Sequence, residues 1–472
     1  MLTRTRTVLA TDASTAVNVR RFGAVGDGLA DDTAALQRAL DSGRSLHLPE
    51  GVYRTTATLN SASDTSITGD GPGSVIDASA VDGNAIAITG QLTALPDLSE
   101  TPSGNALTFD TTPTLARGDI ICIWDPAEGS YSTFRPVYYD GEFAVVNAVD
   151  GATVALTSRV HKAYDPTEVN LYRLGAVVVT LTGFGVKGTV QVTRGRNVQI
   201  ARMAVQTTGH RAIGLTQCVG VSVRDCDVSN DGIDEGTDYG ISIANCQHVR
   251  VSACDVFGRR HSVVTGGAGG PGSVPCRDVV IDGCTLKNSG DIHNADFHGN
   301  TIASLYTNCT IYGGAGLQGR DNAYVNNVIY GMRSAGTCLY GAEMVGGTHR
   351  FVGNRLFTHV DPNESARGVV DFGGNSVTAI TEKSGDLTIV VRDNTCESVH
   401  LSGDTNFLLV LNRGSTSKLN VICENNVLLV NALANVARVR LIWGTASKDF
   451  VTASGNLANV SATELNADVG YA

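Results

Sequence analysis

Short stretches of alternating apolar and polar residues fill most of the chain, and one such stretch returns repeatedly. CVGVSVRDCDV at 218–228 returns as CQHVRVSACDV at 246–256 and as CRDVVIDGCTL at 276–286. The alternation predicts β-strands, because successive side chains of a strand point to opposite faces. A pattern that recurs every ~20–45 residues predicts a solenoid of stacked units. The chain is therefore predicted to be all-β and to fold as a parallel β-helix.

Each stretch ends in Cys, Asn or Met, where the strand is expected to turn a corner. The aligned positions are Met203, Cys226, Cys254, Cys284, Cys309, Asn327, Asn354, Asn394, Asn426 and Asn456. A metal site and a disulfide framework are alternatives for the cysteines, but zinc sites expect closer pairs or His partners. The 11 cysteines are odd in number, and the chain far exceeds the small domains that need disulfides. We predict that Cys226, Cys254 and Cys284 are buried, reduced and stacked in one file.

A helical pattern lies near the start of the chain, in the stretch LADDTAALQRALDSGRSLHLPEGVY. Asp31 or Asp32 is placed to begin a short helix, and Gly43 is placed to end it. Leu36 and Leu40 would lie on one face of this helix. A solenoid needs its open end covered, and one amphipathic helix does this.

A second β-rich pattern, at 119–165, interrupts the repeats. Within it, Asp150 and Gly151 predict a hairpin turn between FAVVNAV and ATVAL. The predicted organisation is an N-terminal extension (1–16), the β-helix start with its capping helix (17–95), a β-rich insertion (96–175) and the main β-helix (176–472).

Composition and charge exclude several classes of partner. The 472 residues include 54 Gly, only 17% are charged and the net charge is −11, without a run of Lys or Arg. This balance is typical of β-rich, turn-rich proteins and does not favour nucleic acid as a partner. No apolar run is long enough for a membrane span. The start, MLTRTRTVLATDASTA, lacks the apolar core of a secretory signal, so an extracellular role would require another exit, such as a particle released by lysis.

Several motifs carry a resemblance to a known family. NVRRFGAVGDGLADDTAALQRAL followed by LHLPEGVY resembles the N-terminal signature of the pectate-lyase-like superfamily. GRRHSVVTGG (258–267), GDIHNADFHGN (290–300) and LQGRDN (317–322) are similar to a motif series of phage tailspike depolymerases within that superfamily. The insertion resembles a module that follows the first rungs of many tailspikes. The polygalacturonase motifs NTD, GHG and RIK are absent, which puts that family's hydrolytic chemistry in doubt.

The resemblance implies several properties of the molecule. It implies a right-handed β-helix that assembles as a homotrimer and binds a bacterial surface polysaccharide. It also implies attachment to a phage tail or baseplate, so the protein would be made in the host cytoplasm and act as part of the virion.

Polar residues recur on the strands that precede the corners. Stacked about 4.8 Å apart, they would form a column suited to binding sugar. The members are Arg211, Tyr239, Arg260, His261, His293, Asp296, His298, Gln318, Arg320, Tyr340 and Glu343. Any one of them could be an ordinary solvated residue, but the strands before the corners within 259–321 carry three His and three Arg, which favours a functional site.

A uronate lyase is the chemistry we favour for this column. It needs a base, a cation that neutralises the carboxylate and a donor for the leaving oxygen. The candidates are His293 as base, Asp291 or Asp296 to orient it, Arg260 and Arg320 as cations, and Tyr239 or His261 as acid. The spacing of Asp291 and His293 also resembles the D-P-H element of mannuronan epimerases, whose first half-reaction matches that of a lyase.

Two other functions remain open. A glycoside hydrolase needs two carboxyls about 5–5.5 Å or about 6.5–9.5 Å apart, and Asp234 and Glu235 in NDGIDEGTDYG are candidates. The same loop could instead bind Ca²⁺ or cap a turn; no other metal or cofactor is expected. The third function is a non-catalytic, glycan-binding adhesin.

The candidates for sugar binding are Tyr239, Asp234, Glu235, His298, Gln318, Tyr340 and Glu343. The prediction is a tailspike depolymerase that cleaves a capsular or exopolysaccharide, by β-elimination in preference to hydrolysis.

Overall fold

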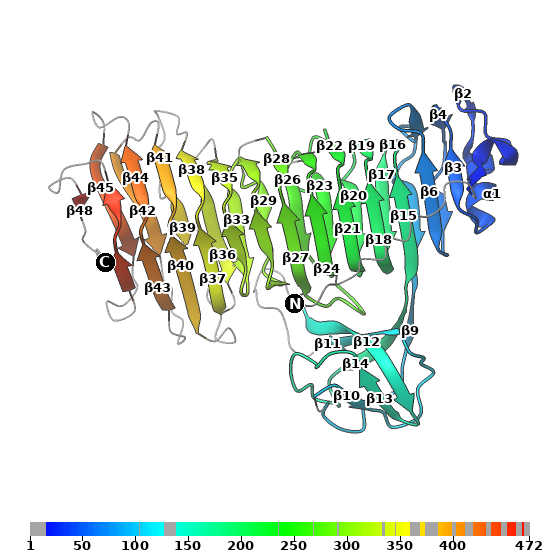
Figure 1. Cartoon of the computed structure of the whole chain (residues 1–472), viewed down its shortest axis with the longest axis horizontal. Coiled ribbons are helices and arrows are strands. Elements are labelled where there is room, and N and C mark those ends of the chain that lie inside the picture. Colours follow the sequence, from blue (N-terminus) through cyan, green and yellow to red (C-terminus); the bar gives the residue numbers. More distant parts are fainter. Residues whose placement is uncertain are drawn as a thin grey trace, which may run out of the picture.

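The computed structural model describes residues 16–102, 104–126, 138–234, 236–267, 269–289, 292–332, 336–344, 346–358, 369–372, 386–398, 403–410, 419–430, 436–444, 451–458 and 465–466. Over these residues the chain winds through three long parallel sheets, here called A, B and C, and returns to each sheet once per rung (Figure 1). The predicted parallel β-helix is confirmed.

Successive rungs supply neighbouring strands of each sheet. Sheet A contains β1 (Val17–Asn18), β3 (Leu46–Leu48), β6 (Thr65–Gly69), β15 (Val177–Thr182), β18 (Gly195–Ala201), β21 (Val219–Arg224), β24 (Gln247–Ser252), β27 (Cys276–Asp282), β30 (Thr301–Ile302), β31 (Leu305–Thr307), β34 (Ala323–Val325), β37 (Gly347–Val352), β40 (Leu387–Arg392), β43 (Leu419–Glu424) and β46 (Val451–Ser454). Sheet B contains β2 (Asp27–Asp31), β4 (Gly51–Arg54), β7 (Ser74–Asp77), β16 (Gly185–Lys187), β19 (Ala204–Thr207), β22 (Asp227–Asn230), β25 (Asp255–Gly258), β28 (Thr285–Lys287), β32 (Thr310–Tyr312), β35 (Val328–Tyr330), β38 (Arg355–Thr358), β41 (Thr395–Ser398), β44 (Val427–Val430) and β47 (Leu457–Ala458). Sheet C contains β5 (Leu59–Ser61), β8 (Asn84–Thr89), β17 (Thr189–Thr193), β20 (Arg211–Thr216), β23 (Tyr239–Ala244), β26 (His261–Gly266), β29 (Ala295–Asp296), β33 (Ala315–Gly319), β36 (Leu339–Met344), β39 (Val370–Phe372), β42 (Gly403–Val410), β45 (Val436–Gly444) and β48 (Leu465–Asn466).

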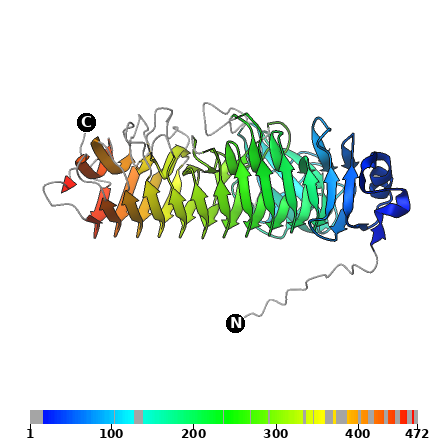
Figure 2. The same ribbon diagram turned by 90° about the horizontal axis from the view of Figure 1, so that it is seen from above.

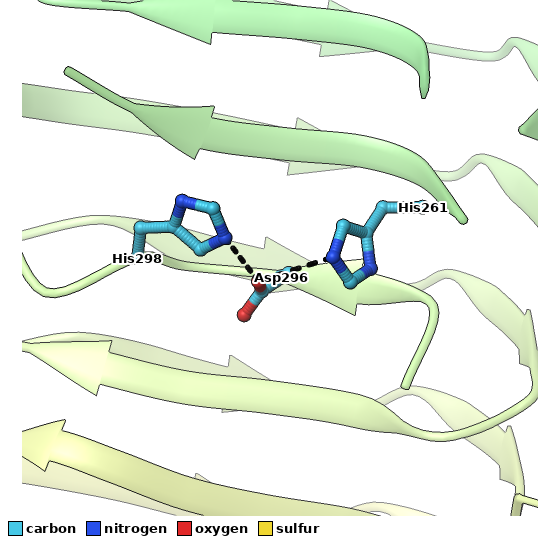
Figure 3. Close-up of side chains that lie close together, drawn as sticks. All are labelled: His261, Asp296 and His298. Carbon is cyan, nitrogen blue, oxygen red and sulfur yellow. Dashed lines mark ion pairs between the residues drawn. The ribbon is translucent and has the colours of Figure 1, made fainter. Parts of the chain in front are cut away.

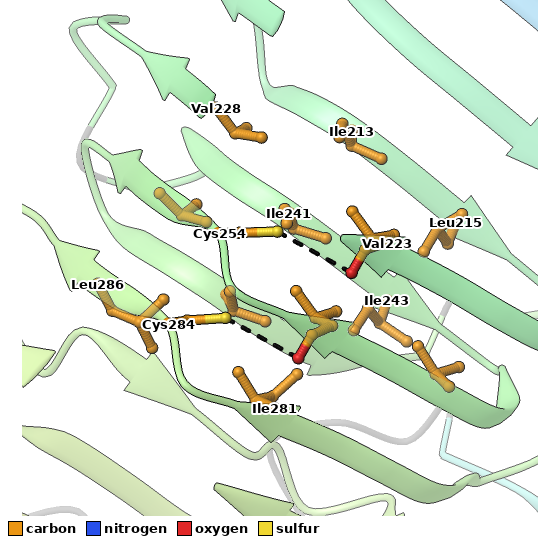
Figure 4. Packing of buried hydrophobic residues seen from close by; sticks show 14 of the residues in the cluster. Ile213, Leu215, Val223, Val228, Ile241, Ile243, Cys254, Ile281, Cys284 and Leu286 are labelled. Atoms are coloured by element: carbon orange, nitrogen blue, oxygen red, sulfur yellow. Dashed lines mark hydrogen bonds between the residues drawn. The ribbon is translucent and has the colours of Figure 1, made fainter. Parts of the chain in front are cut away.

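The corner between sheets A and B holds the predicted file of Cys and Asn residues. The residue after each corner donates its N–H to the carbonyl of the preceding corner, from Asp227 N–H to Met203 O (2.9 Å) through to Leu457 N–H to Asn426 O (2.8 Å). Cys254 and Cys284 lie in the apolar core of the β-helix, and each thiol donates to a carbonyl of an earlier rung (Figure 4). All 11 cysteines are free and buried, as predicted for Cys226, Cys254 and Cys284.

Asparagines replace the thiols in the later rungs and form a hydrogen-bonded ladder. The side-chain carbonyl of Asn354 accepts from the backbone N–H and the side-chain amide of Asn327, at 2.9 and 3.0 Å. Its own amide donates to Tyr324 O (3.0 Å) and to Asn394 Oδ1 (3.0 Å). A buried amide thus satisfies polar groups of three rungs at once.

Loss of one rung of this ladder should weaken the fold. Asn354→Ala leaves several buried groups without partners, each at about 1–3 kcal/mol, so we expect the free energy of unfolding to fall by about 3 kcal/mol. Thermal or denaturant unfolding would measure the loss. Asn420→Ala is the matched control, because the Asn420 amide makes one long contact (3.4 Å) to Thr388 Oγ1 and is not part of the ladder. Equal stabilities of the two variants would contradict a structural role for the ladder.

The predicted capping helix is present at the blue end of the solenoid (Figure 2). α1 (Thr33–Asp41) follows a 3-10 turn, η2 (Val19–Phe22), and buries Leu36 and Leu40. Asp32 occupies the N-cap position, but its carboxylate accepts from Val25 and Gly26 N–H and ties the preceding loop to the helix. No helix in the described part of the chain is long and apolar enough to cross a membrane.

A separate antiparallel sheet, here called the module, projects from one side of the β-helix (Figure 1). Its strands are β9 (Gln91–Ala94), β10 (Ala106–Thr108), β11 (Ile120–Asp125), β12 (Asp140–Asp150), β13 (Thr153–Leu156) and β14 (Asn170–Gly175). The predicted hairpin joins β12 and β13, with Gly151 at φ +56°. Val274 of the β-helix packs against Phe143 and Leu174 of the module, so an apolar contact holds the two parts together.

Candidate active site

Four aromatic and imidazole rings stack at the start of the sheet C strands; we call them the ring column. They are Tyr239, His261, His293 and Tyr340. Tyr239 and His261 are register partners on β23 and β26, with ring centroids 5.6 Å apart. His293, just before β29, lies 5.0 Å from the His261 ring and 5.6 Å from the Tyr340 ring. Neighbouring strands lie about 4.8 Å apart, so side chains in register meet face to face.

Gly316 makes the last of these contacts possible. It lies on β33, between Asp296 of β29 and Tyr340 of β36 in the strand register. A Cβ at Gly316 would meet Asp296 Oδ1 and would lie 2.7 Å from His293 Cδ2. Because Gly316 has no side chain, Tyr340 can reach across β33 and stack on His293.

A buried carboxylate lies beneath the column, surrounded by imidazoles; we call Asp296, His261, His293 and His298 the histidine cluster. Asp296 is 1% exposed, and its Oδ2 lies 2.7 Å from His298 Nε2, 3.3 Å from His293 Nε2 and 3.6 Å from His261 Nε2. His298 and His261 lie on opposite sides of it (Figure 3). Gln318 Nε2 donates to Oδ1 at 3.1 Å. Burial disfavours the charged carboxylate, but the imidazoles of His298 and His293 outweigh it and hold the pKa of Asp296 well below its usual range.

Hydrogen bonds fix the protonation of His261. Its Nδ1 lies 2.6 Å from the carbonyl oxygen of His293, which can only accept, so Nδ1 carries the proton. Its Nε2 accepts from Arg260 Nε at 2.9 Å, because a guanidinium can only donate. Burial also lowers the pKa of His261 well below its usual value, although the nearby Asp296 carboxylate acts to raise it. His261 is therefore a neutral, fully buried support for the backbone of His293.

His293 is the imidazole of the cluster that reaches the surface. Its side chain is 14% exposed, compared with 7% for His298 and 0% for His261. Its Nε2 faces Asp296, which leaves Nδ1 as the other ring nitrogen. Among the residues that the structure describes, no group hydrogen-bonds to Nδ1 of His293. This geometry suits a base oriented by a carboxylate.

Three adjoining hollows run beside sheet B and its turns towards the ring column. They have volumes of about 310, 390 and 310 Å³. The first two share Lys187, the second and third share Gly209, and the third reaches Asp234. Arg260 Nη1 donates to Gly236 O of the same loop at 2.8 Å, so one side chain links the end of the hollows to the cluster.

Comparison with known proteins decides the family. The family model described as Gp49, pectin lyase-like, matches residues 206–447, which is more than half of the chain. The chain belongs to the Gp49 pectin lyase-like family. Models described as rhamnogalacturonase A/epimerase, pectate lyase-like, and as tailspike protein-like, Ig-like domain, match residues 16–111 and 87–174 of this Gp49-family chain.

Solved phage tailspikes resemble the Gp49-family chain over nearly its whole length. The tailspike gp49 of Pseudomonas phage LKA1 is 30% identical with a TM-score of 0.84, over 95% of this chain and 83% of that one. The tailspike gp61 of Pseudomonas phage phi297 is 26% identical with a TM-score of 0.81, over 94% and 80%. The gp54 tailspike of Acinetobacter baumannii bacteriophage AP22, at 21% identity and a TM-score of 0.72 over 93% and 76%, shows the shared fold.

Curated relatives match only short stretches. The pre-neck appendage protein of Bacillus phage B103 is 40% identical over 55 residues, which is 12% of this chain and 6% of that protein. The mannuronan C5-epimerase AlgE1 of Azotobacter vinelandii is 38% identical over 87 residues, which is 16% of this chain and 6% of that protein. The chain thus spans a small fraction of the length of these relatives.

The structure places several predicted residues of this Gp49-family chain together and others apart. Tyr239, His261, His293 and Tyr340 form the ring column, and Asp296, His298 and Gln318 meet beneath it. Arg211 is the register partner of Tyr239 on β20. Asp291, Glu235 and the side chain of Glu343 lie outside the described residues.

Arg320 differs from the expectation that it joins the column, and Asp234, a candidate for hydrolysis and sugar binding, lies in a turn. Arg320 follows β33, beyond Gly319 at φ +77°; its side chain is 54% exposed and pairs with Asp321 at 3.5 Å. It lies beyond the end of β33 and forms a β-bridge with Ile302 of sheet A, so its backbone is not in line with the sheet C column. Asp234 is exposed, and its oxygens accept from Gly236 N–H (2.6 Å) and the Thr237 hydroxyl (2.9 Å), which is the turn-capping role.

Three residues of the histidine cluster lie close enough together to be considered as ligands of a metal ion. The ligand atoms of His261, Asp296 and His298 lie within 4.8 Å of one another, and two imidazoles with a carboxylate are typical zinc ligands. The Nε2 lone pair of His261, however, already accepts from the Arg260 guanidinium. A metal ion would have to displace a permanent cation, so this arrangement does not fit one.

Sequence reasoning missed two residues that touch the cluster. Gly316 looks like any other glycine of GGAGLQG, and only the register shows that it faces Asp296 and His293. Tyr138 belongs to the module, yet its hydroxyl lies 3.3 Å from His298 Nδ1. No signal in the sequence connects two residues 160 positions apart.

Proposed function

We propose that this protein is a phage tailspike depolymerase that cleaves an acidic bacterial surface polysaccharide by β-elimination. The observation that carries the proposal is His293, a partly exposed imidazole that the buried carboxylate of Asp296 orients through Nε2 (3.3 Å). Elimination beside a uronate carboxylate starts with removal of a proton from carbon, and an imidazole with one free nitrogen suits this step.

The proposed reaction assigns a role to each group around His293. Nδ1 of His293 takes the proton on the carbon beside the carboxylate, the electron pair forms a carbon–carbon double bond, and the glycosidic oxygen leaves. Tyr340, whose ring stacks on His293, is the hydroxyl that we propose protonates that oxygen, and Tyr239 lies at the other end of the column. His261 is fully buried with both ring nitrogens engaged, so it positions His293 and does not act as the acid.

Neutralisation of the substrate carboxylate falls to Arg260 in this proposal. Arg260 lies at the column, where its Nε donates to His261 Nε2 and its Nη1 donates to Gly236 O, and its guanidinium is permanently charged. Arg320 lies beyond the end of β33 with an exposed side chain that pairs with Asp321, and we propose that it contacts the polymer outside the reacting sugar.

The hollows beside sheet B supply a path for the polymer. Lys187, His210 and Arg211 line them together with several aspartates, a mixture suited to hydroxyls and carboxylates of a glycan. The AP22 tailspike gp54 was solved in complex with an A. baumannii capsular saccharide, which supports a glycan as the ligand of this scaffold.

The tailspike relatives also support a place on the particle. We propose that the protein is part of the virion tail, attached to the tail or baseplate as a homotrimer. The support is that two solved neighbours above 25% identity are phage tailspikes.

Digestion of purified capsular polysaccharides tests the reaction type. β-Elimination is expected to give an unsaturated uronate product with new ultraviolet absorbance, together with loss of polymer viscosity. New reducing ends without that absorbance would replace the lyase by a hydrolase that uses paired carboxyls. Binding without loss of viscosity would replace both by an adhesin.

Chelation tests whether the reaction needs a metal. Because the Arg260 guanidinium occupies the Nε2 lone pair of His261, we expect dialysis against EDTA to leave the cleavage rate unchanged. Rates measured with and without added Ca²⁺ and Zn²⁺ complete the test. A loss that Zn²⁺ restores would instead indicate a metal at His261, Asp296 and His298, and a loss that only Ca²⁺ restores would indicate an oxygen-lined site.

A further inference from the structure

We propose that the module is part of the active site, because Tyr138 positions the imidazole of His298 and, through it, Asp296 and His293. The inference rests on the proposed function and names a positioning residue for it. Tyr138 is not among the residues that line the three hollows, and its hydroxyl faces His298, so we expect its effect on the reaction to pass through the histidine cluster.

The contact between the module and the cluster is a buried hydrogen bond. Tyr138, two residues before β12, is 1% exposed, and its hydroxyl lies 3.3 Å from His298 Nδ1. The opposite nitrogen, Nε2, lies 2.7 Å from Asp296 Oδ2 and carries a proton, because a carboxylate only accepts. In the neutral ring, Nδ1 therefore accepts from the Tyr138 hydroxyl. This bond fixes the rotation of the imidazole and the proton that faces Asp296.

Two glycines of the β-helix leave space for the ring of Tyr138. Gly266 and Gly267 follow His261 on the same rung. A Cβ at Gly267 would lie 3.0 Å from Tyr138 Cδ1, and one at Gly266 would lie 3.4 Å from His298 Nδ1. Two adjacent glycines thus allow the module to approach the cluster closely.

The module is also held firmly enough to act as a support. Phe143 N–H donates to Gln247 Oε1 at 3.1 Å, and Gln247 Nε2 donates to Pro275 O at 3.3 Å, both buried. Val274 completes an apolar cluster with Phe143 and other module residues. These contacts lie on the rungs of β24 and β27, beside the rungs that carry the cluster, so a packed and hydrogen-bonded interface holds the module next to the cluster.

Loss of the hydroxyl should therefore change the rate and not the binding. Without it, His298 Nδ1 loses its hydrogen bond to Tyr138, and the Asp296 carboxylate loses a fixed neighbour on one side. His293 is oriented by the same oxygen, Asp296 Oδ2. A displacement of a catalytic group by about 1 Å can cost about 10²-fold in rate, so we expect kcat to fall by about 10–100-fold with KM unchanged.

Tyr138→Phe and a matched tyrosine variant test the inference. Tyr164 is equally buried in the module, and its hydroxyl donates to Glu142 Oε1 at 2.9 Å, away from the cluster. Tyr138→Phe should lose kcat, whereas Tyr164→Phe should lose stability at most. The two variants would be compared by thermal unfolding and by kcat and KM on the same polymer. Equal kcat values in the two variants would overturn the inference.

A double-mutant cycle tests the route through His298. In a His298→Asn background, Tyr138→Phe should cause no further loss of kcat, since the group that it positions is absent. An additive loss would overturn the inference, because Tyr138 would then act elsewhere.

The His293→Asn variant distinguishes failure of this inference from failure of the proposed function. Wild-type turnover in His293→Asn would contradict the proposed function itself. An inactive His293→Asn beside a fully active Tyr138→Phe would defeat only the role of the module.

Discussion

Replacement of His293 by Asn is expected to slow polymer cleavage by about 10²–10⁴-fold, the usual contribution of a general base. Asn keeps a polar side chain of similar size that can still face Asp296, but it cannot take a proton. The ring of His293 is mostly buried between His261 and Tyr340, so modest loss of stability is expected beside the loss of rate. Polymer binding should persist, because the hollows beside sheet B are unchanged.

His248→Asn is the matched control for this variant. His248 also pairs with an aspartate, Asp278, at 2.8 Å, but it lies on the exposed face of sheet A. Its backbone is left-handed, with φ +58°, a conformation that Asn tolerates. The control should keep both fold and rate. Wild-type turnover in His293→Asn, measured as initial rate on the same polymer, would remove His293 from the mechanism.

The fold was predictable because each rung carries its own signal. A strand of alternating residues and the corner residue that follows it occupy about ten positions, and the same pattern recurs in every later rung. The cysteines could be interpreted as core thiols, since their spacing does not fit zinc and their odd number in so long a chain does not favour a disulfide framework. A further signal was available at the residue before each corner, which adopts left-handed backbone: Asp225 at φ +54°, Asn326 at +58° and Asn425 at +55°. Asp, Asn and Gly recur there because they adopt this conformation most readily.

The members of the candidate site were predictable, but their orientation was not. Strand register brings Tyr239, His261 and the segment around His293 into line, and this follows from the repeat alone. Which side chains turn inward does not follow, so His261 and Asp296 looked like surface groups although both are buried. Arg320 looked like a neighbour of His293 because the sequence does not reveal that the chain turns at Gly319.

Contacts between segments that are distant in the sequence are the hardest feature to predict from the sequence. Tyr138 reaches His298 only because the module folds back onto the rungs of β24 and β27. No periodicity relates the module to the solenoid, since the module has its own antiparallel pairing and its own core. The family motifs gave the presence of both parts, and only the packed interface shows that they share a hydrogen bond.

Gly316→Ala is expected to lower the rate by about 10²-fold while the chain still folds, because it displaces catalytic groups without changing any of them. The backbone of Gly316 is not left-handed, so alanine adds no backbone strain and acts only through its methyl group. That methyl would press on Asp296 Oδ1 and lie 2.7 Å from His293 Cδ2, and neither side chain is free to move. Overpacking of this kind costs about 1–3 kcal/mol, which a solenoid of this size should tolerate.

Gly175→Ala supplies the comparison, at the end of a strand of the module. A Cβ at Gly175 on β14 would lie 3.2 Å from Gln91 Cβ, away from the cluster and the hollows, and the backbone of Gly175 is not left-handed. Its rate and thermal unfolding should match the wild type, whereas Gly316→Ala should keep polymer binding and lose turnover. Full activity in Gly316→Ala would mean that the rings of His293 and Tyr340 need not stack for cleavage. The hydroxyl of Tyr340 would then lose its place as the proton donor, because only that stacking brings it to the base.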